Sequence, residues 1–238
     1  MIVKKIVWFC LSGATLVSAM VWAQEAAPRE PSRLERQVLA FADADQANPP
    51  PVSPILLVGS SSFRRWRTAV EDLDNPDVLN RGFGGSRMSH VLQWYDLVVR
   101  PYDPRQVLVY EGDNDIWSGM EPKQVEQDFR TFIERVRGDF PDAEILLLYV
   151  KPSPRRMSKR AEYEELNHRM RMLADHFEGV DVVDTWTPML DERNEPREDL
   201  FVADRLHLSE KGYEVWSSLL RPLLRPRQEE PAADANKD

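Results

Sequence analysis

The chain has 238 residues, of which 42% are hydrophobic and 30% charged, the composition of an ordinary soluble globular protein. This length predicts one domain with a substantial core and terminal extensions. The net charge is −9, so the chain has no overall positive charge that would attract the phosphates of a nucleic acid. This excludes a general nucleic-acid-binding protein.

The first 23 residues have the layout of a secretory signal peptide. Lys4 and Lys5 precede an apolar run over residues 6–23, and small residues stand before a cleavage position ahead of Gln24. The run also reaches the minimum of ~17–18 residues for a membrane span, so an uncleaved anchor is the alternative. The only cysteine, Cys10, lies within this segment, and the mature chain would therefore have none. We expect a periplasmic or secreted protein with no stable membrane span after cleavage.

The rest of the chain divides into three parts. Residues 24–51 are expected to form a linker and an N-terminal helix that Ser32 caps and that runs from Arg33 to about Ala44. Residues 52–225 are expected to form the main domain, and residues 226–238 a polar, disordered tail.

Short apolar strands alternate with amphipathic helices through the main domain. Strands are expected at 55–58, 78–80, 106–110, 144–150 and 180–183. Helices are expected from the serines after the first strand to about residue 70, and then over 90–99, 122–138, 158–177 and 209–220. This alternation predicts an α/β fold, a three-layer α/β/α sandwich around a five-stranded parallel sheet. We predict a flavodoxin-like strand order, 2-1-3-4-5.

Polar and glycine-rich segments follow the first three strands. They are residues 59–61 (Gly-Ser-Ser), 84–86 (Gly-Gly-Ser) and 112–115 (Gly-Asp-Asn-Asp). The carboxyl ends of parallel strands meet at one edge of the sheet, so these segments are expected to converge there. Residues 204–207 (Asp-Arg-Leu-His) stand near the C-terminus, and residues 151–156 form either a substrate-facing or a plain crossover loop at the same edge.

This set of residues suits acyl transfer by an activated serine. A serine hydroxyl is a weak nucleophile and needs an adjacent base, and His207 titrates near neutral pH. Asp204 can turn back to the imidazole, fix its tautomer and stabilise its charged form. The backbone N–H groups of Ser61 and Gly85, with the side-chain amide of Asn114, can supply three donors to the oxyanion.

Residues 52–222 resemble the SGNH (GDSL-type) hydrolases. The resemblance rests on segments 59–61, 80–85, 112–115 and 204–207, which match the four sequence blocks of that family in order and spacing. It implies that Ser61 is the nucleophile, that Gly85 and Asn114 belong to the oxyanion hole, and that the fold is flavodoxin-like. It also implies a substrate range from lysophospholipids to acetylated sugars and short acyl esters.

One position departs from the family pattern. Ser60 stands where the family usually has aspartate. That aspartate is not the catalytic acid, and the Ser60 hydroxyl is expected to bond to nearby backbone or to the region of Asp113. We therefore expect activity to survive.

The sequence thus predicts an exported serine esterase that needs no metal or other cofactor. Its substrate would be an acyl or acetyl ester of a small molecule or a glycan. An O-acyltransferase on the same residues is one alternative, and a non-catalytic glycan-binding module, motivated by Ser60, is another. A third is a metal phosphoesterase that would use Asp113, Asp115, Asp204 and His207 as ligands.

Overall fold

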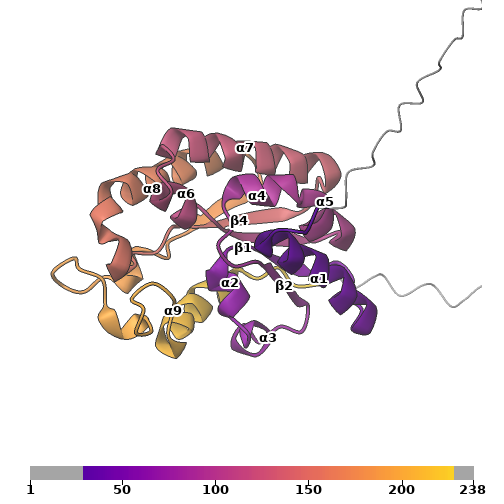
Figure 1. Cartoon of the computed structure of the whole chain (residues 1–238), viewed down its shortest axis with the longest axis horizontal. Helices are drawn as coiled ribbons and strands as arrows, with labels where there is room; N and C mark the ends of the chain where they lie inside the picture. Colours follow the sequence, from indigo (N-terminus) through magenta and orange to yellow (C-terminus); the bar gives the residue numbers. More distant parts are fainter. Residues whose placement is uncertain (1–28, 228–238) are drawn as a thin grey trace, which may run out of the picture. The chain divides into compact units, whose positions relative to one another are not determined.

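The computed structural model describes residues 29–227, and within this range the residues from Ser32 onward form one compact unit (Figure 1). The expected signal peptide (1–23), most of the linker and most of the expected tail (226–238) lie outside the described residues. No helix within 29–227 is long and apolar enough to cross a membrane.

The core of the unit is a five-stranded sheet in which every strand pair is parallel. The strands are β1 (Ile55–Gly59), β2 (Val78–Gly82), β3 (Gln106–Tyr110), β4 (Glu144–Leu148) and β5 (Val180–Val183). Their order, β2-β1-β3-β4-β5, confirms the prediction. Strands β1 and β3 are buried along their whole length, which explains their uninterrupted apolar sequences. Gly59 pairs with both Gly82 and Tyr110, so the first three strands end level with one another.

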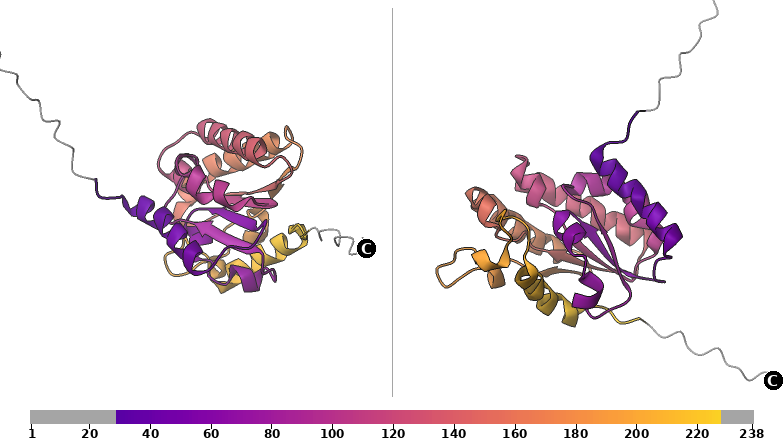
Figure 2. Two further views of the ribbon diagram at one scale, coloured as in Figure 1. Left: turned by 90° about the vertical axis from the view of Figure 1, so that its right-hand side faces the viewer. Right: turned by 60° about the horizontal axis from the view of Figure 1, so that its bottom comes forward.

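Helices cover both faces of the sheet (Figures 1 and 2). Alternate residues of β1 point to opposite faces, with Leu56 and Val58 in one core cluster and Ile55 and Leu57 in the other. The first face carries α4 (Met88–Gln93), α5 (Tyr95–Val98), α7 (Pro122–Asp139) and α8 (Arg160–Ala174), and α1 (Arg33–Ala47) packs beside α5. The second face carries α2 (Ser61–Arg65), α3 (Ala69–Asp72) and α9 (Glu210–Leu220).

Shorter elements complete the described chain. Helix α6 (Asp113–Trp117) follows β3, where the sequence suggested only a turn. The 3-10 helices are η1 (Arg100–Tyr102), η2 (Pro154–Lys159), η3 (Thr187–Met189), η4 (Glu198–Leu200) and η5 (Arg221–Leu223).

Helix α1 begins at the cap that the sequence predicted. The Ser32 hydroxyl accepts the backbone N–H of Glu35, and the Glu35 carboxylate accepts the backbone N–H of Ser32. This reciprocal arrangement satisfies two of the donors that a helix start leaves free.

Tertiary hydrogen bonds explain where two elements end earlier than expected. The single helix expected after β1 is two short helices, because the Asn80 side chain donates to the carbonyls of Phe63 and Trp66 and ends α2 there. Strand β4 ends at Leu148 because the backbone N–H and carbonyl of Val150 bond to the side chain of Asn167 instead. Local sequence does not identify Asn80 or Asn167 as the residue whose side chain ends these elements.

Candidate active site

The nucleophile candidate lies at the start of the helix that follows β1. Ser61 is the first residue of α2, directly after the buried N-cap residue Ser60. The first N–H groups of a helix have no intrahelical acceptor, so the backbone N–H of Ser61 is available at the carboxyl edge of the sheet. The Tyr213 hydroxyl donates to the carbonyl of Ser62 at 2.8 Å and ties α9 to this turn.

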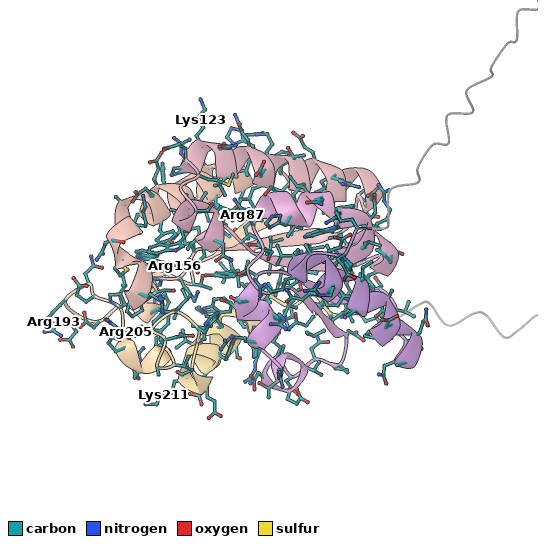
Figure 3. All side chains as sticks on the ribbon, viewed as in Figure 1. Arg87, Lys123, Arg156, Arg193, Arg205 and Lys211 are labelled. Atoms are coloured by element: carbon teal, nitrogen blue, oxygen red, sulfur yellow. The ribbon has the colours of Figure 1, made fainter. Side chains whose placement is uncertain are left out.

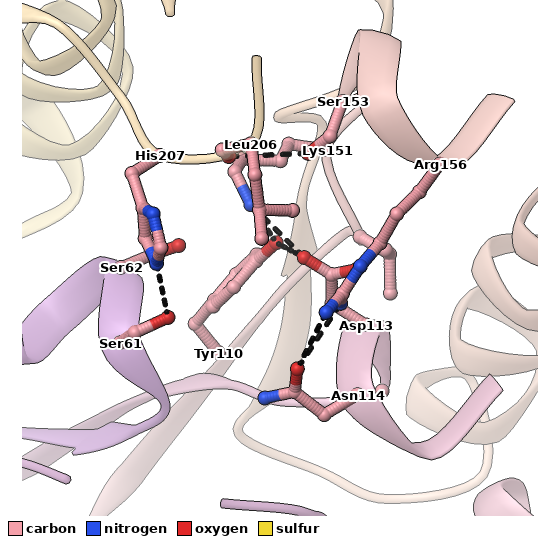
Figure 4. Close-up of polar contacts among 12 residues, drawn as sticks. Ser61, Ser62, Tyr110, Asp113, Asn114, Lys151, Ser153, Arg156, Leu206 and His207 are labelled. Atoms are coloured by element: carbon pink, nitrogen blue, oxygen red, sulfur yellow. Dashed lines mark hydrogen bonds and ion pairs between the residues drawn. The ribbon is translucent and has the colours of Figure 1, made fainter. Parts of the chain in front are cut away.

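A chain of hydrogen bonds joins Ser61 to two residues that lie more than 140 positions away, and Figure 4 shows its first link, from Ser61 to His207. The Nε2 atom of His207 is 3.0 Å from the Ser61 Oγ atom, and its Nδ1 atom is 2.6 Å from Asp204 Oδ2. The other oxygen of Asp204 accepts the backbone N–H groups of Leu206 and His207. Asp204 thus holds the Nδ1–H side of the ring, which leaves Nε2 free to accept the Ser61 proton.

The charges in this chain favour a neutral imidazole beside an ionised carboxylate. Burial lowers the pKa of His207 below its ordinary value of 6.5. The hydrogen bond that the ring donates to Asp204 opposes this, and the positive charges of Arg65 and Lys151 reinforce it. Burial alone would raise the pKa of Asp204, but hydrogen bonds from the His207 backbone and ring lower it well below its usual range. At neutral pH His207 can therefore accept a proton and Asp204 can stabilise the resulting cation.

This arrangement predicts that activity is lost at acidic pH with a midpoint below pH 6.5. The base must be neutral to act, so a lowered pKa of His207 moves the loss of activity to more acidic pH. The value of kcat/KM for 4-nitrophenyl acetate should rise through one ionisation below pH 6.5 and stay level to about pH 8. Enzyme that has been held at each pH and then assayed at neutral pH controls for unfolding. A loss of activity with its midpoint above pH 6.5 would contradict the lowered pKa of His207.

The two other residues expected in the oxyanion hole, Gly85 and Asn114, follow β2 and β3. Gly85 has φ +88°, a backbone conformation that favours glycine, and its N–H donates to no group among residues 29–227. The side chain of Asn114 is held at both ends: its Oδ1 atom accepts Nη1 and Nη2 of Arg156 at 3.1 Å, and its Nδ2 atom donates to the carbonyl of Ser86 at 2.8 Å. Because a guanidinium can only donate, it fixes which end of the amide is the oxygen.

A buried ionic cluster supports Asn114 from behind (Figure 4). The Asp113 carboxylate accepts Arg156 at 2.6 Å and Lys151 at 3.0 Å, and the hydroxyls of Tyr110 and Tyr163 complete its shell. Burial alone would raise the pKa of Asp113, but the two cations lower it to about 2. The loop over residues 151–156 therefore supplies structural cations to the site, a role that its sequence did not indicate.

We expect Asp113→Asn to destabilise the protein by about 3–5 kcal/mol, because it leaves the cations of Lys151 and Arg156 buried without a counter-charge. Urea unfolding at pH 7 measures this loss, and Asp139→Asn, which breaks an exposed pair with Arg100, should cost at most about 1 kcal/mol. The pKa of Asp113 is lowered on folding, so its stabilisation is present above pH 3.8 and is lost as the pH falls through about 2. An Asp113→Asn variant as stable as the Asp139→Asn control would contradict this account.

A buried carboxyl group lies behind the Gly85 loop. The Ser86 hydroxyl lies within hydrogen-bond distance of two acceptors, Glu111 Oε1 at 2.5 Å and the carbonyl of Phe83 at 2.9 Å. Complete burial raises the pKa of Glu111 well above its usual value. The contact fastens Ser86, at the end of the Gly85 loop, to the residue that directly follows β3.

Helix α1 fastens the other end of the same loop. Gln37 Oε1 accepts the backbone N–H of Gly84 at 2.9 Å, and Arg33 Nη2 donates to the carbonyl of Gly84 at 3.1 Å. The two peptide groups that flank the Gly84 Cα atom are thereby each held by a side chain from a helix that the sequence placed outside the main domain. Sequence spacing gave no signal for this contact.

The Ser60 side chain does not behave as expected. It is buried, but its hydroxyl forms no hydrogen bond with any residue in the described part of the chain, neither at the helix cap nor with Asp113. The prediction of such a bond was wrong because Lys151 and Arg156 already occupy the Asp113 carboxylate. The backbone of Ser60 instead anchors the turn, since its N–H donates to the carbonyl of Tyr110.

The acidic residues that suggested a metal site do not form one donor set. Asp113 is neutralised by cations, and Asp115 accepts the backbone N–H groups of Met88 and Gly112. Within residues 29–227 no group of three or more His, Cys, Asp or Glu residues is arranged to hold a metal ion.

Comparison with known proteins agrees with this geometry. Residues 50–215 match the GDSL-like Lipase/Acylhydrolase family, and no curated protein matches the sequence. A GDSL-like lipase from Bacteroides thetaiotaomicron has a similar structure, with a TM-score of 0.67 and 18% identity over 78% of this chain and 96% of that one. An acetylxylan esterase from Geobacillus stearothermophilus has a TM-score of 0.62 and 16% identity over 75% of this chain and 99% of that one. At these identities the solved structures establish the fold.

The family match covers well over half of the chain and includes all four sequence blocks, from the serine turn after β1 to the Asp-x-x-His segment. The chain belongs to the GDSL-like lipase/acylhydrolase family and is a serine ester hydrolase of the SGNH type.

Proposed function

We propose that the mature chain is an exported esterase that hydrolyses acyl or acetyl esters through an acyl-enzyme on Ser61. The observation that carries the proposal is the hydrogen-bonded chain from Ser61 Oγ to His207 Nε2 at 3.0 Å and from His207 Nδ1 to Asp204 at 2.6 Å. In this proposal Gly85 and Asn114 supply donors for the oxyanion; the positive φ of Gly85 and the fixed orientation of the Asn114 amide support these roles.

In the first half of the reaction, Ser61 Oγ attacks the ester carbonyl while His207 Nε2 takes its proton. The N–H groups of Ser61 and Gly85 and the amide of Asn114 stabilise the negative carbonyl oxygen. Asp204 stabilises the imidazolium. When the tetrahedral intermediate collapses, the bond to the alcohol oxygen breaks and His207 gives that oxygen its proton.

In the second half, water repeats the attack on the acyl-enzyme. His207 takes a proton from the water, the bond to Ser61 Oγ breaks, and His207 returns the proton to Ser61 as the carboxylic acid leaves. If a sugar hydroxyl replaced the water, the same residues would perform O-acyl transfer. Analysis of the products with and without an excess of acceptor alcohol separates hydrolysis from transfer.

Two observations support a small or soluble ester. The exposed large apolar side chains among residues 29–227 are single residues of several different elements. An acetylxylan esterase is among the proteins that share this fold. A screen of 4-nitrophenyl esters of increasing acyl length, with acetylated glycans alongside, tests the proposal, and a rate that falls steadily beyond the shortest acyl chains is the expected result.

Export rests on the N-terminal sequence. Lys4 and Lys5, the apolar run over 6–23 and the small residues before Gln24 support cleavage by a signal peptidase. N-terminal sequencing of the protein recovered outside the cytoplasm should give a chain that begins at Gln24. A chain that kept Met1 and sedimented with membranes would instead support an uncleaved anchor.

A further inference from the structure

A cavity of about 450 Å³ opens beside His207, and arginines supply most of its wall. It is lined by Arg64, Arg65, Arg67, Leu208 and Tyr213, and we call it the arginine hollow. Leu208 directly follows His207 in the chain, and the charge of Arg65 is felt at the His207 ring. The hollow therefore borders the proposed general base.

The same hollow also adjoins the nucleophile. Arg64 and Arg65 stand three and four residues after Ser61 in α2, the spacings at which helical side chains are neighbours. Arg64 also reaches the Gly85 loop, because its Nη1 atom lies 3.3 Å from the position that a Cβ atom on Gly84 would occupy. The hollow is thus lined by the helix that starts at Ser61 and by the residue that follows His207.

Within the described part of the chain the arginines of the hollow have no counter-charge. Within residues 29–227 Arg64, Arg65 and Arg67 form no ion pair, and all three are exposed. The chain has 40 acidic and 31 basic residues, so carboxylates are in excess. Elsewhere arginines at this edge are paired, as Arg156 is with Asp113 and Arg205 with Glu198. Clustered cations of this kind repel one another unless an anion joins them.

We propose that the arginine hollow binds a negatively charged group on the alcohol part of the ester. The inference rests on the proposed function, because His207 gives its proton to the departing alcohol and the alcohol must therefore lie on the His207 side. A planar guanidinium matches a carboxylate, sulfate or phosphate with two parallel hydrogen bonds. The substrate class is then an ester of an anionic alcohol, for example an acylated acidic sugar.

A pair of matched esters tests the charge directly. The substrates are 4-acetoxybenzoate, which carries the anion on the alcohol part, and its neutral methyl ester, methyl 4-acetoxybenzoate. A third substrate, mono-4-nitrophenyl succinate, carries the anion on the acyl part. The wild-type and variant values of kcat/KM are compared for each substrate, so that differences in intrinsic reactivity cancel.

We expect Arg65→Gln to lose about tenfold more kcat/KM on 4-acetoxybenzoate than on its methyl ester, since hydrogen bonds to charged groups are worth about that much. Arg65→Lys, which keeps the charge, should recover part of the loss. The matched control is Lys123→Gln, which removes a positive charge from an exposed side chain that projects outward from α7 (Figure 3) and should leave the ratio between the two esters unchanged. Added salt should weaken the wild-type preference for the anionic ester.

The outcomes separate this inference from the proposed function. Equal losses on both acetoxybenzoates would overturn the anion site, and so would a loss confined to the succinate ester, which would place the charge on the acyl part. If the enzyme turned over no ester and Ser61 reacted with no fluorophosphonate, the proposed function would fail and this inference with it. Normal labelling of Ser61 without a charge preference would overturn the inference alone.

Discussion

Ser61→Ala and His207→Ala should each lower the turnover of 4-nitrophenyl acetate by about 10⁴- to 10⁶-fold, the scale seen when a nucleophile or its base is removed from a serine hydrolase. The reason is geometric. Ser61 Oγ and His207 Nε2 are 3.0 Å apart, and no other serine in the described part of the chain contacts the His207 ring. Because the two residues act as a unit, the double variant should be little worse than either single variant.

The control for this experiment is Ser218→Ala, which changes an exposed serine of α9 and should keep wild-type turnover. A fluorophosphonate should form one adduct, on Ser61, and mass spectrometry of the digested protein locates it. An unlabelled Ser61 would favour the glycan-binding module. Loss of turnover with a chelator would favour the metal phosphoesterase. Wild-type turnover in Ser61→Ala would end the assignment of the nucleophile.

Asn114→Ala should lower kcat by about 10²–10³ and change KM little, because it removes one donor to the oxyanion and leaves the other donors in place. Asn114→Asp is the sharper test. Arg156 would still hold the side chain, but the group facing the oxyanion would be an acceptor with a negative charge. We therefore expect its kcat to be at least as low as that of the alanine variant.

Gln124→Ala, which removes an exposed amide from α7, is the matched control for Asn114 and should keep wild-type kcat. Urea unfolding of each variant separates a loss of catalysis from a loss of folding. If Asn114→Asp retained most of the wild-type kcat, the side chain of residue 114 would have no part in stabilising the oxyanion.

Much of the fold could be read from local sequence, because the physical signals are short-range. The apolar run of residues 55–58 marks a strand buried on both faces, and the alternation of such strands with helices predicts the parallel sheet and its order. The segments that contain Ser61, Gly85 and Asn114 follow successive strands, and strand ends share an edge. Hydrogen bonds join Ser61 to His207 and His207 to Asp204, although the last two stand far away in sequence.

The supporting groups could not be predicted, because they depend on contacts across long stretches of chain. Arg156 acts on Asn114 only because Asn114 belongs to a helix, α6, that the sequence suggested to be a turn. Lys151 resembles any loop lysine until the packing shows that it is buried against Asp113. The raised pKa of Glu111 beside Ser86 depends on complete burial, which composition around a strand end does not specify.

Because α1 contacts Gly84, the part of the chain that the enzyme needs begins before the residues that match the family. The family match begins at residue 50, yet Gln37 accepts the backbone N–H of Gly84 and Arg33 donates to its carbonyl, and Gly84 directly precedes Gly85. A buried polar group without a partner costs about 1–3 kcal/mol. The smallest fragment that keeps this edge of the sheet intact therefore starts at the Ser32 cap, and a helix that looks like a lead-in to the domain is one of its structural supports.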